Sequence, residues 1–225
     1  NLMSAFLALS LLSAWAGTSA LDTTVTLTAT DDVWAYPHAG DPTSDPFLRV
    51  WGSEGESVGP SDLFEGAWSY SFARFDLSSV PAKGSLKSAK LVLMVAYNDS
   101  LSVEDAKRFP IEARLAGSDF REKGWVFEDV AKVAPKKGKE FLLGSNFPAS
   151  WTEGKPTRVE IDLLKGEGGF EKSLWQAVAS SKSLALALTS PISPGDLGRS
   201  AVYRIHSRNG DAELAPKLVL TVAPG

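Results

Sequence analysis

The side chains of this chain that could bind a ligand are aromatic and basic residues beside acidic, glycine-rich loops in the first third of the sequence. Trp34, Trp51 and Trp68 each lie at or near the edge of such a loop, with Tyr36 and Arg49 close by. Flat aromatic faces stack on the apolar C–H face of sugar rings, and polar side chains at the rim bind the hydroxyl groups. The pattern therefore favours a carbohydrate site, with burial of these tryptophans in a core as the competing interpretation.

An anionic glycan would need cationic side chains for its recognition. The candidates are Arg49, Arg121, Lys136 and Lys137. The two lysines belong to residues 132–139, the one dense basic cluster of the chain. A solvated loop is the ordinary interpretation of such a cluster, and a contact for anionic ligands is the alternative.

Four aspartates lie close together near the start of the chain. Asp31, Asp32, Asp41 and Asp45 are the candidate ligands of a metal ion. Calcium binds six to eight oxygen atoms from carboxylates and carbonyls, and it is the metal that a cysteine-free extracellular sandwich would use. We expect calcium as a structural cofactor, while aspartates that form turns explain the same pattern without a metal.

Catalytic chemistry finds little support in the sequence. Neither His38 nor His206 lies in a recognisable nucleophile context. The 27 acidic residues offer many carboxylate pairs, so glycoside cleavage stays open. We expect a protein that is not an enzyme.

Composition narrows the class of protein. The 225 residues are 44% hydrophobic and 22% charged, which is typical of an ordinary folded domain. The net charge of −4 disfavours nucleic acid as a partner. The absence of cysteine excludes disulfides and thiolate metal sites.

Residues 1–20 contain no charge and an apolar run that ends in small residues. This pattern is typical of a secretory signal peptide, and the run is shorter than the roughly 20 residues of a membrane span. We therefore expect a secreted or cell-surface protein without a stable membrane span. The alternative is a retained apolar segment that packs against the domain or supports self-assembly.

Residues 70–95 show the clearest structural pattern. Two alternating apolar runs flank a polar link that contains proline and glycine, which predicts two β-strands. Arg74 and Asp76 lie two residues apart on one face, so we expect an ion pair between them. The second strand is apolar on both faces and is expected in the middle of a sheet.

The remaining pattern predicts some ten strands and one convincing helix. The helix, residues 168–181, carries Phe170, Leu174 and Val178 at spacings of four. A short helical turn is expected at 103–107, and the long loop at 52–67 is a candidate binding rim. We predict that residues 21–225 form one antiparallel β-sandwich of jelly-roll type with one short helix. The other expected strands are 24–27, 33–36, 47–51, 111–115, 157–163, 184–188, 201–205 and 216–222.

Several of these strings resemble a known family in order along the chain. Residues 74–81, RFDLSSVP, and 88–93, SAKLVL, resemble the signature of DNRLRE-type domains, which include the family 96 carbohydrate-binding modules. The resemblance continues through 159–162, 184–188, 205–208 and 216–222, and covers most of residues 24–222. The usual Ser-Arg-Glu near the end of the domain is replaced here by Ser207-Arg208-Asn209.

The resemblance implies an exported β-sandwich of the kind that accompanies polysaccharide-degrading enzymes or cell-surface assemblies. Glycan binding, including that of acidic glycans, belongs to some members of the family. We therefore predict a secreted, non-catalytic module that binds a polysaccharide or a cell-surface glycan. The alternative is a surface structural or adhesion subunit of an extracellular assembly.

Overall fold

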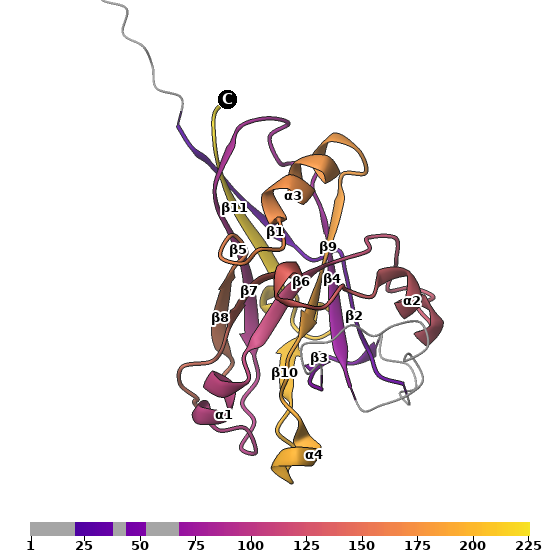
Figure 1. The fold of residues 1–225 in the computed structure, drawn as a ribbon, viewed down its shortest axis with the longest axis vertical. Helices are drawn as coiled ribbons and strands as arrows, with labels where there is room; N and C mark the ends of the chain where they lie inside the picture. Colours follow the sequence, from indigo (N-terminus) through magenta and orange to yellow (C-terminus); the bar gives the residue numbers. More distant parts are fainter. Residues whose placement is uncertain (1–20, 38–43, 53–67) are drawn as a thin grey trace, which may run out of the picture.

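Two antiparallel β-sheets face each other in the computed structural model, which describes residues 21–37, 44–52 and 68–225 (Figure 1). The first sheet has the order β1 (Thr23–Thr28), β11 (Lys217–Ala223), β5 (Ser85–Val95), β10 (Tyr203–His206) and β3 (Phe47–Val50), and β8 (Thr157–Asp162) pairs with β5. The second sheet has the order β2 (Asp31–Ala35), β4 (Tyr70–Asp76), β9 (Ser183–Thr189), β6 (Ile111–Ala116) and β7 (Leu142–Asn146). The predicted antiparallel sandwich of jelly-roll type is confirmed.

The main core lies between the two sheets. Strand β4 contributes Phe75 to it, and β5 contributes Leu91 and Leu93, all of them buried. Alternate residues of a strand point to opposite faces, so the intervening residues of β4 lie on the other side of the second sheet. There Phe72 joins a second buried group, here called the outer cluster, which also holds Trp68, Tyr70, Phe120, Trp125, Val130 and Val133. The second sheet is therefore covered on both faces.

Strand β9 illustrates how the sequence permits this double burial. Leu184, Leu186 and Leu188 belong to the main core, whereas Ala185 and Ala187 belong to the outer cluster. The small alanines leave room for aromatic rings on the outer face. This alternation of large and small residues explains why a strand with an unbroken apolar run from Leu184 to Leu188 lies inside the sheet.

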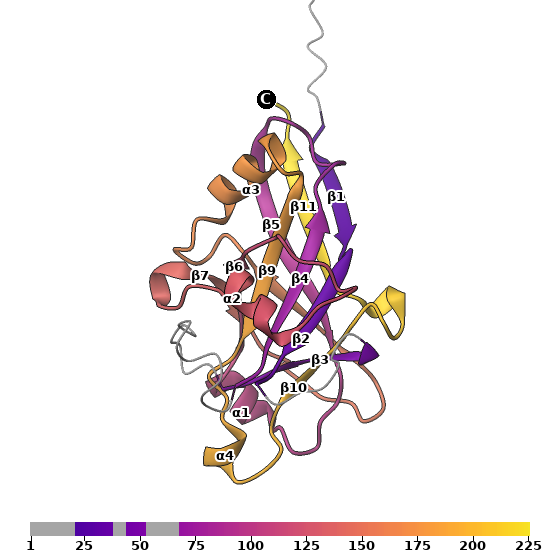
Figure 2. The same cartoon turned by 90° about the vertical axis from the view of Figure 1, so that its right-hand side faces the viewer.

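Helices are short in the described residues. They are α1 (Val103–Arg108), α2 (Val130–Val133), α3 (Phe170–Ala179) and α4 (Pro194–Leu197), with 3-10 turns at Phe127–Asp129, Lys139–Phe141 and Ala212–Leu214. Helix α3 is the predicted helix, and it buries Phe170, Leu174 and Val178 as expected. In Figure 2, α3 lies on the opposite side of the molecule from β1. None of the helices formed by described residues is long and apolar enough to cross a membrane.

The predicted ion pair of Arg74 has a different partner in the structure. Arg74 donates to Asp31 Oδ2 from Nη2 at 2.6 Å and from Nε at 3.0 Å. The register of β2 on β4 places Asp31 directly opposite Arg74. Asp76 at the exposed end of β4 instead accepts hydrogen bonds from the backbone and hydroxyl of Ser78. The expectation of an Arg74–Asp76 pair was therefore wrong, because pairing across strands brought a nearer carboxylate.

Candidate functional site

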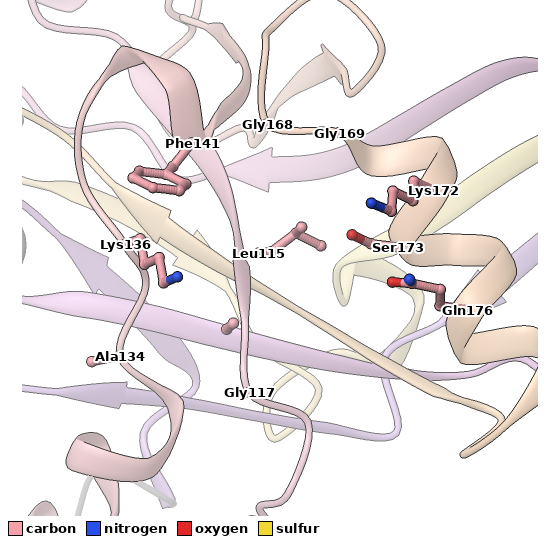
Figure 3. A pocket seen from close by; sticks show the side chains of 11 residues that line it. Leu115, Gly117, Ala134, Lys136, Phe141, Gly168, Gly169, Lys172, Ser173 and Gln176 are labelled. Atoms are coloured by element: carbon pink, nitrogen blue, oxygen red, sulfur yellow. The ribbon is translucent and has the colours of Figure 1, made fainter.

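A cleft of about 630 Å³ opens between the end of β6 and the first turns of α3 (Figure 3). One wall is the segment that connects α2 to β7, and the opposite wall is α3. The floor is formed by the last residues of β6. The lining residues are Leu115, Ala116, Gly117, Ala134, Lys136, Phe141, Gly168, Gly169, Lys172, Ser173 and Gln176.

The polar side chains of the two walls face each other across this cleft. Figure 3 shows Lys136 and Phe141 on one side, and Lys172, Ser173 and Gln176 on the other. The Lys136 ammonium lies 5.4 Å from the centroid of the Phe141 ring, which is 36% exposed. The lining set contains two lysines and no aspartate or glutamate. The cleft therefore presents positive charge, hydrogen-bonding groups and one aromatic ring.

Buried Arg114 holds the wall that carries Lys136. Its Nη1 donates to the carbonyl oxygens of Gly138 at 2.8 Å and Lys136 at 3.4 Å. Its Nη2 pairs with Glu112 Oε2 at 3.1 Å, and the Arg114 side chain is only 3% exposed. Thr189 receives a hydrogen bond from Arg114 and donates one to Glu112. This network fixes the backbone from which Lys136 enters the cleft.

The opposite wall is held against β7 by two backbone hydrogen bonds. Gly166 donates to the Leu143 carbonyl at 2.8 Å, and Gly168 donates to the Leu142 carbonyl at 3.0 Å. Gly169 is the N-cap residue that precedes α3, and it has a left-handed conformation with a φ of 71° and no side-chain cap. The first N–H groups of a helix carry a partial positive charge, and the carboxylate of Glu171 in the first turn of α3 offsets it.

The groups that line the cleft suit the binding of an anion. Ammonium groups form charge-assisted hydrogen bonds with carboxylates or sulfates, and the exposed ring of Phe141 offers a stacking surface. Glycoside cleavage needs two carboxylates, and a triad needs a histidine. Neither group is present among the residues that line this cleft.

Four of the residues predicted to bind a ligand come together elsewhere, between β2 and β3. The Arg49 guanidinium lies 5.5 Å from the centroid of the Trp34 ring, and the rings of Tyr36 and Trp51 are 5.7 Å apart. All four side chains are half-buried. Arg49 also pairs with Asp45 at 3.2 Å, which neutralises much of its charge. The predicted rim at 52–67 lies outside the described residues except for Gly52.

Trp68 does not share that surface. It is 5% exposed and packs in the outer cluster, where its ring lies 4.6 Å from Tyr70. Trp68 is therefore a core residue, as the competing interpretation of the tryptophans held.

Of the predicted basic residues, Lys136 lines the cleft, and Lys137 is half-buried beside it. Arg121 is exposed and donates to the Phe120 carbonyl at 2.8 Å.

Two of the four predicted calcium ligands form ion pairs in the structure. Asp31 pairs with Arg74, Asp45 pairs with Arg49, and Asp41 lies outside the described residues. Within the described ranges, no three acidic or histidine side chains are grouped so that they could hold a metal ion. Calcium binding stays a prediction.

Asp32, the neighbour of Asp31 in β2, is fully buried. Its Oδ2 accepts a hydrogen bond from the backbone of Arg208 at 2.9 Å, and its Oδ1 has no partner among the described residues. Burial is the main cause that raises the pKa of Asp32 to about 7, and the neighbouring carboxylates of Glu122 and Asp31 act in the same direction. The hydrogen bond and charge of Arg208 act in the opposite direction.

Several residues of the cleft were missed from the sequence. Lys172 and Gln176 lie four apart on the polar face of the predicted helix, which was the available signal. Phe141 and Arg114 gave no signal, because neither belongs to a recognisable motif. Which polar face would meet the basic segment at 132–139 depends on how α3 docks.

Comparisons with known proteins identify no relative by sequence. No family model matches the chain, and no curated protein does. Similar solved structures include the infectious bursal disease virus VP2 subviral particle, with 15% identity, 92% coverage of this chain and a TM-score of 0.27. A particle derived from the same virus matches with 12% identity, 91% coverage and a TM-score of 0.27. The viral particle itself matches with 14% identity, 92% coverage and a TM-score of 0.24.

The likeness to these viral structures is weak. This chain spans only 39%, 36% and 37% of the respective matched chains. Identities and TM-scores this low carry no argument about what the chain does. The function must therefore be argued from the geometry of the molecule.

Proposed function

We propose that this protein is a non-catalytic module that binds an acidic polysaccharide in the cleft between β6 and α3. The observation that carries the proposal is the pair of lysines, Lys136 and Lys172, which enter one cleft from opposite walls without a lining carboxylate. Such a pair would offer two ammonium groups to the carboxylate or sulfate groups of the glycan.

The other lining groups suit a sugar better than a simple inorganic anion. The exposed ring of Phe141 would stack on the apolar face of a sugar ring, beside the ammonium of Lys136. Ser173 and Gln176 on the helical wall would donate to and accept from sugar hydroxyl groups. The ring fixes the plane of the sugar, and the polar groups select its substituents.

Two expectations from the sequence agree with this proposal. Lys136 was a predicted contact for anionic ligands, and the resemblance to DNRLRE-type domains implies glycan binding, with acidic glycans among the ligands of some members. Export to the cell exterior, where such polymers occur, belongs to the same proposal. The predicted signal segment at 1–20 lies outside the described residues.

The proposal is tested by binding to polygalacturonate, polymannuronate and chondroitin sulfate, with cellulose and xylan as neutral polymers. We expect binding to at least one acidic polymer, and the double variant Lys136→Ala/Lys172→Ala should weaken it about tenfold or more. The matched control is Lys87→Ala/Lys155→Ala, which removes two exposed lysines away from the cleft and should bind normally. Silence with every acidic polymer, or equal loss in both double variants, would contradict the proposal.

A surface structural or adhesion subunit is the second candidate function, and the open edge of the first sheet favours it. Strand β1 is an end strand whose pairing within the described residues is with β11 alone. Its Thr23, Thr24, Thr26 and Thr28 are exposed. An exposed strand edge can accept a strand from another chain. Light scattering across a range of protein concentrations separates the candidates, because a structural subunit should form polymers and a binding module should stay monomeric.

A further inference from the structure

A second cleft, of about 540 Å³, lies near the opposite end of α3. It is bounded by the ends of β4 and β9 and by the segment that follows β6. Every residue that lines it is polar, and half of them carry a hydroxyl group. The lining residues are Thr30, Arg74, Asp76, Ser78, Ser118, Asp119, Arg121, Ser181, Lys182 and Ser183.

The charged side chains of this second cleft differ in their hydrogen-bond and ion-pair partners. Arg74 is bound to Asp31 and to the Ser183 hydroxyl, so it mainly supports the wall. Asp76 accepts two hydrogen bonds from Ser78. Arg121 and Lys182 are exposed at the surface of the cleft, opposed there by Asp119. Asp76 is exposed as well, so the exposed charges of the cleft balance, and Arg121 and Lys182 are its two exposed cations.

Lys182 occupies a backbone conformation that favours glycine. Its φ is 55°, and it is the one non-glycine residue with a positive φ among the described residues. This conformation lets its N–H bond to the Ala177 carbonyl at 2.9 Å and its carbonyl accept from Leu77 at 2.8 Å. Glycine would adopt it without strain, so a lysine here carries a backbone cost while it supplies an ammonium group to the cleft.

Neighbouring segments of the chain line the two clefts. Gly117 lines the first cleft, and the next residue, Ser118, lines the second. Helix α3 also connects them, because Gln176 lines the first cleft and Ser181, just after the helix, lines the second. From Lys172 to the end of the helix the axial distance is about 10 Å at 1.5 Å per residue. Several linked sugar rings cover such a distance, whereas one ring does not.

We propose that the ligand is an extended acidic glycan chain that occupies both clefts at once, an inference that rests on the proposed function. One acidic sugar lies between Lys136 and Lys172 in the first cleft. The chain crosses the Gly117–Ser118 segment, and a further unit lies in the second cleft. There Arg121 and Lys182 bind its acidic group, and Ser118 or Ser181 binds its hydroxyl groups.

The test is the dependence of affinity on chain length, measured by calorimetry with oligogalacturonides and oligomannuronates from dimers to about octamers. We expect affinity to rise with length until both clefts are filled and then to level off. The double variant Arg121→Gln/Lys182→Gly should lower the affinity of the longest oligomers about tenfold and leave the shortest unchanged. Lys136→Ala/Lys172→Ala should weaken both. Lys182→Gly keeps the backbone conformation, so folding is preserved.

The outcomes separate this inference from the proposed function. If short and long oligomers bind equally, and the Arg121→Gln/Lys182→Gly variant binds like the parent, the second cleft is not a subsite while the first remains one. If no oligomer and no acidic polymer binds, both proposals fail. The Lys87→Ala/Lys155→Ala variant again serves as the charge-matched control, with thermal unfolding as the check on folding.

Discussion

Two buried ionisable groups show how strongly the surroundings of a single residue decide its behaviour. Arg114 is surrounded by acceptors, since Glu112, Thr189 and two carbonyls receive its N–H groups. Asp32 is buried as completely but has one oxygen without a described partner. A buried charge is tolerated when it is paired and hydrogen-bonded, and otherwise its pKa shifts. The two residues therefore respond differently to substitution.

Asp32 should make the protein less stable as pH rises from about 4 to about 7. Its pKa is raised to about 7 in the folded protein, whereas the ordinary value is 3.8, so the folded state binds the extra proton in this range. The stabilisation from protonated Asp32 is fully present below the pKa that this carboxyl has in the unfolded chain. It is lost as pH rises through the pKa of Asp32 in the folded protein. The loss approaches about 1.4 kcal/mol per pH unit between the two pKa values. Asp32→Asn should flatten this slope when thermal unfolding is followed against pH.

The control for that experiment is Asp76→Asn. The pKa of Asp76 is lowered, first by the hydrogen bond from the Ser78 hydroxyl, so its contribution is lost only at more acidic pH. Its substitution should leave the slope above about pH 5 unchanged. An unchanged slope in Asp32→Asn would show that Asp32 ionises normally in the folded protein.

Arg114→Met should strongly destabilise the protein. The substitution leaves the mostly buried carboxylate of Glu112 without its cation. Removing one partner of a buried ion pair costs about 3–5 kcal/mol. It also releases the Lys136 and Gly138 carbonyls, so polysaccharide affinity should fall as well. Chemical denaturation measures the first effect and calorimetry the second.

The double variant Glu112→Leu/Arg114→Met distinguishes the two consequences. Replacing both charges with apolar groups should recover much of the stability, because no uncompensated charge remains. The affinity should stay low, since the anchor of the Lys136 segment is still absent. Full recovery of affinity in the double variant would show that Arg114 does not position Lys136.

At the scale of elements, the position of α3 depends on a close approach between two backbone segments. One is the connection from β8 to α3, and the other is β7. A Cβ atom added to Gly166 would overlap the carbonyl oxygen of Leu142 and approach the backbone of Leu143. The N–H of Gly166 is meanwhile bonded to the Leu143 carbonyl at 2.8 Å. Backbone lies against backbone here, so neither side can yield by changing a rotamer.

Gly166→Ala should therefore displace α3 and lower stability by about 1–3 kcal/mol, as for other overpacked sites. Displacement of the helix separates Lys172 from Lys136, so acidic polysaccharide binding should weaken in parallel. Urea denaturation and calorimetry on the same preparation measure both effects. Gly195→Ala is the matched control, because its nearest contact would be the Ser193 hydroxyl at 4.0 Å. Equal effects of the two substitutions would contradict the close-packing argument.

At the scale of the whole molecule, a net charge of −4 opposes the approach of an acidic polymer. The two clefts must therefore act through local charge, which salt screens over about 10 Å at 0.1 M. We expect affinity for the acidic polymer to fall as sodium chloride is raised. The Lys136→Ala/Lys172→Ala protein should show a flatter salt dependence. Affinity that does not change with salt would indicate that stacking on Phe141, and not charge, dominates binding.

The sequence by itself determined the elements whose patterns are local. Alternation over 70–95 and the compact apolar run at 184–188 predicted strands that the structure contains, and Phe170, Leu174 and Val178 predicted the buried face of α3. These predictions succeed because a strand with period two or a helix with period 3.6 must place its apolar residues on one face. Strand β7, LLGSN, lacks such a pattern, and it forms through its register with β6.

Only the tertiary structure decided which distant residues meet. It paired Arg74 with Asp31 instead of Asp76, buried Trp68 in the outer cluster, and placed Lys172 opposite Lys136. Each outcome depends on strand register or helix docking between segments far apart in the chain. Packing geometry decides which side chains meet on such surfaces, and no local spacing encodes it. Of the residues that line the candidate cleft, the sequence therefore predicted only Lys136 as a binding residue.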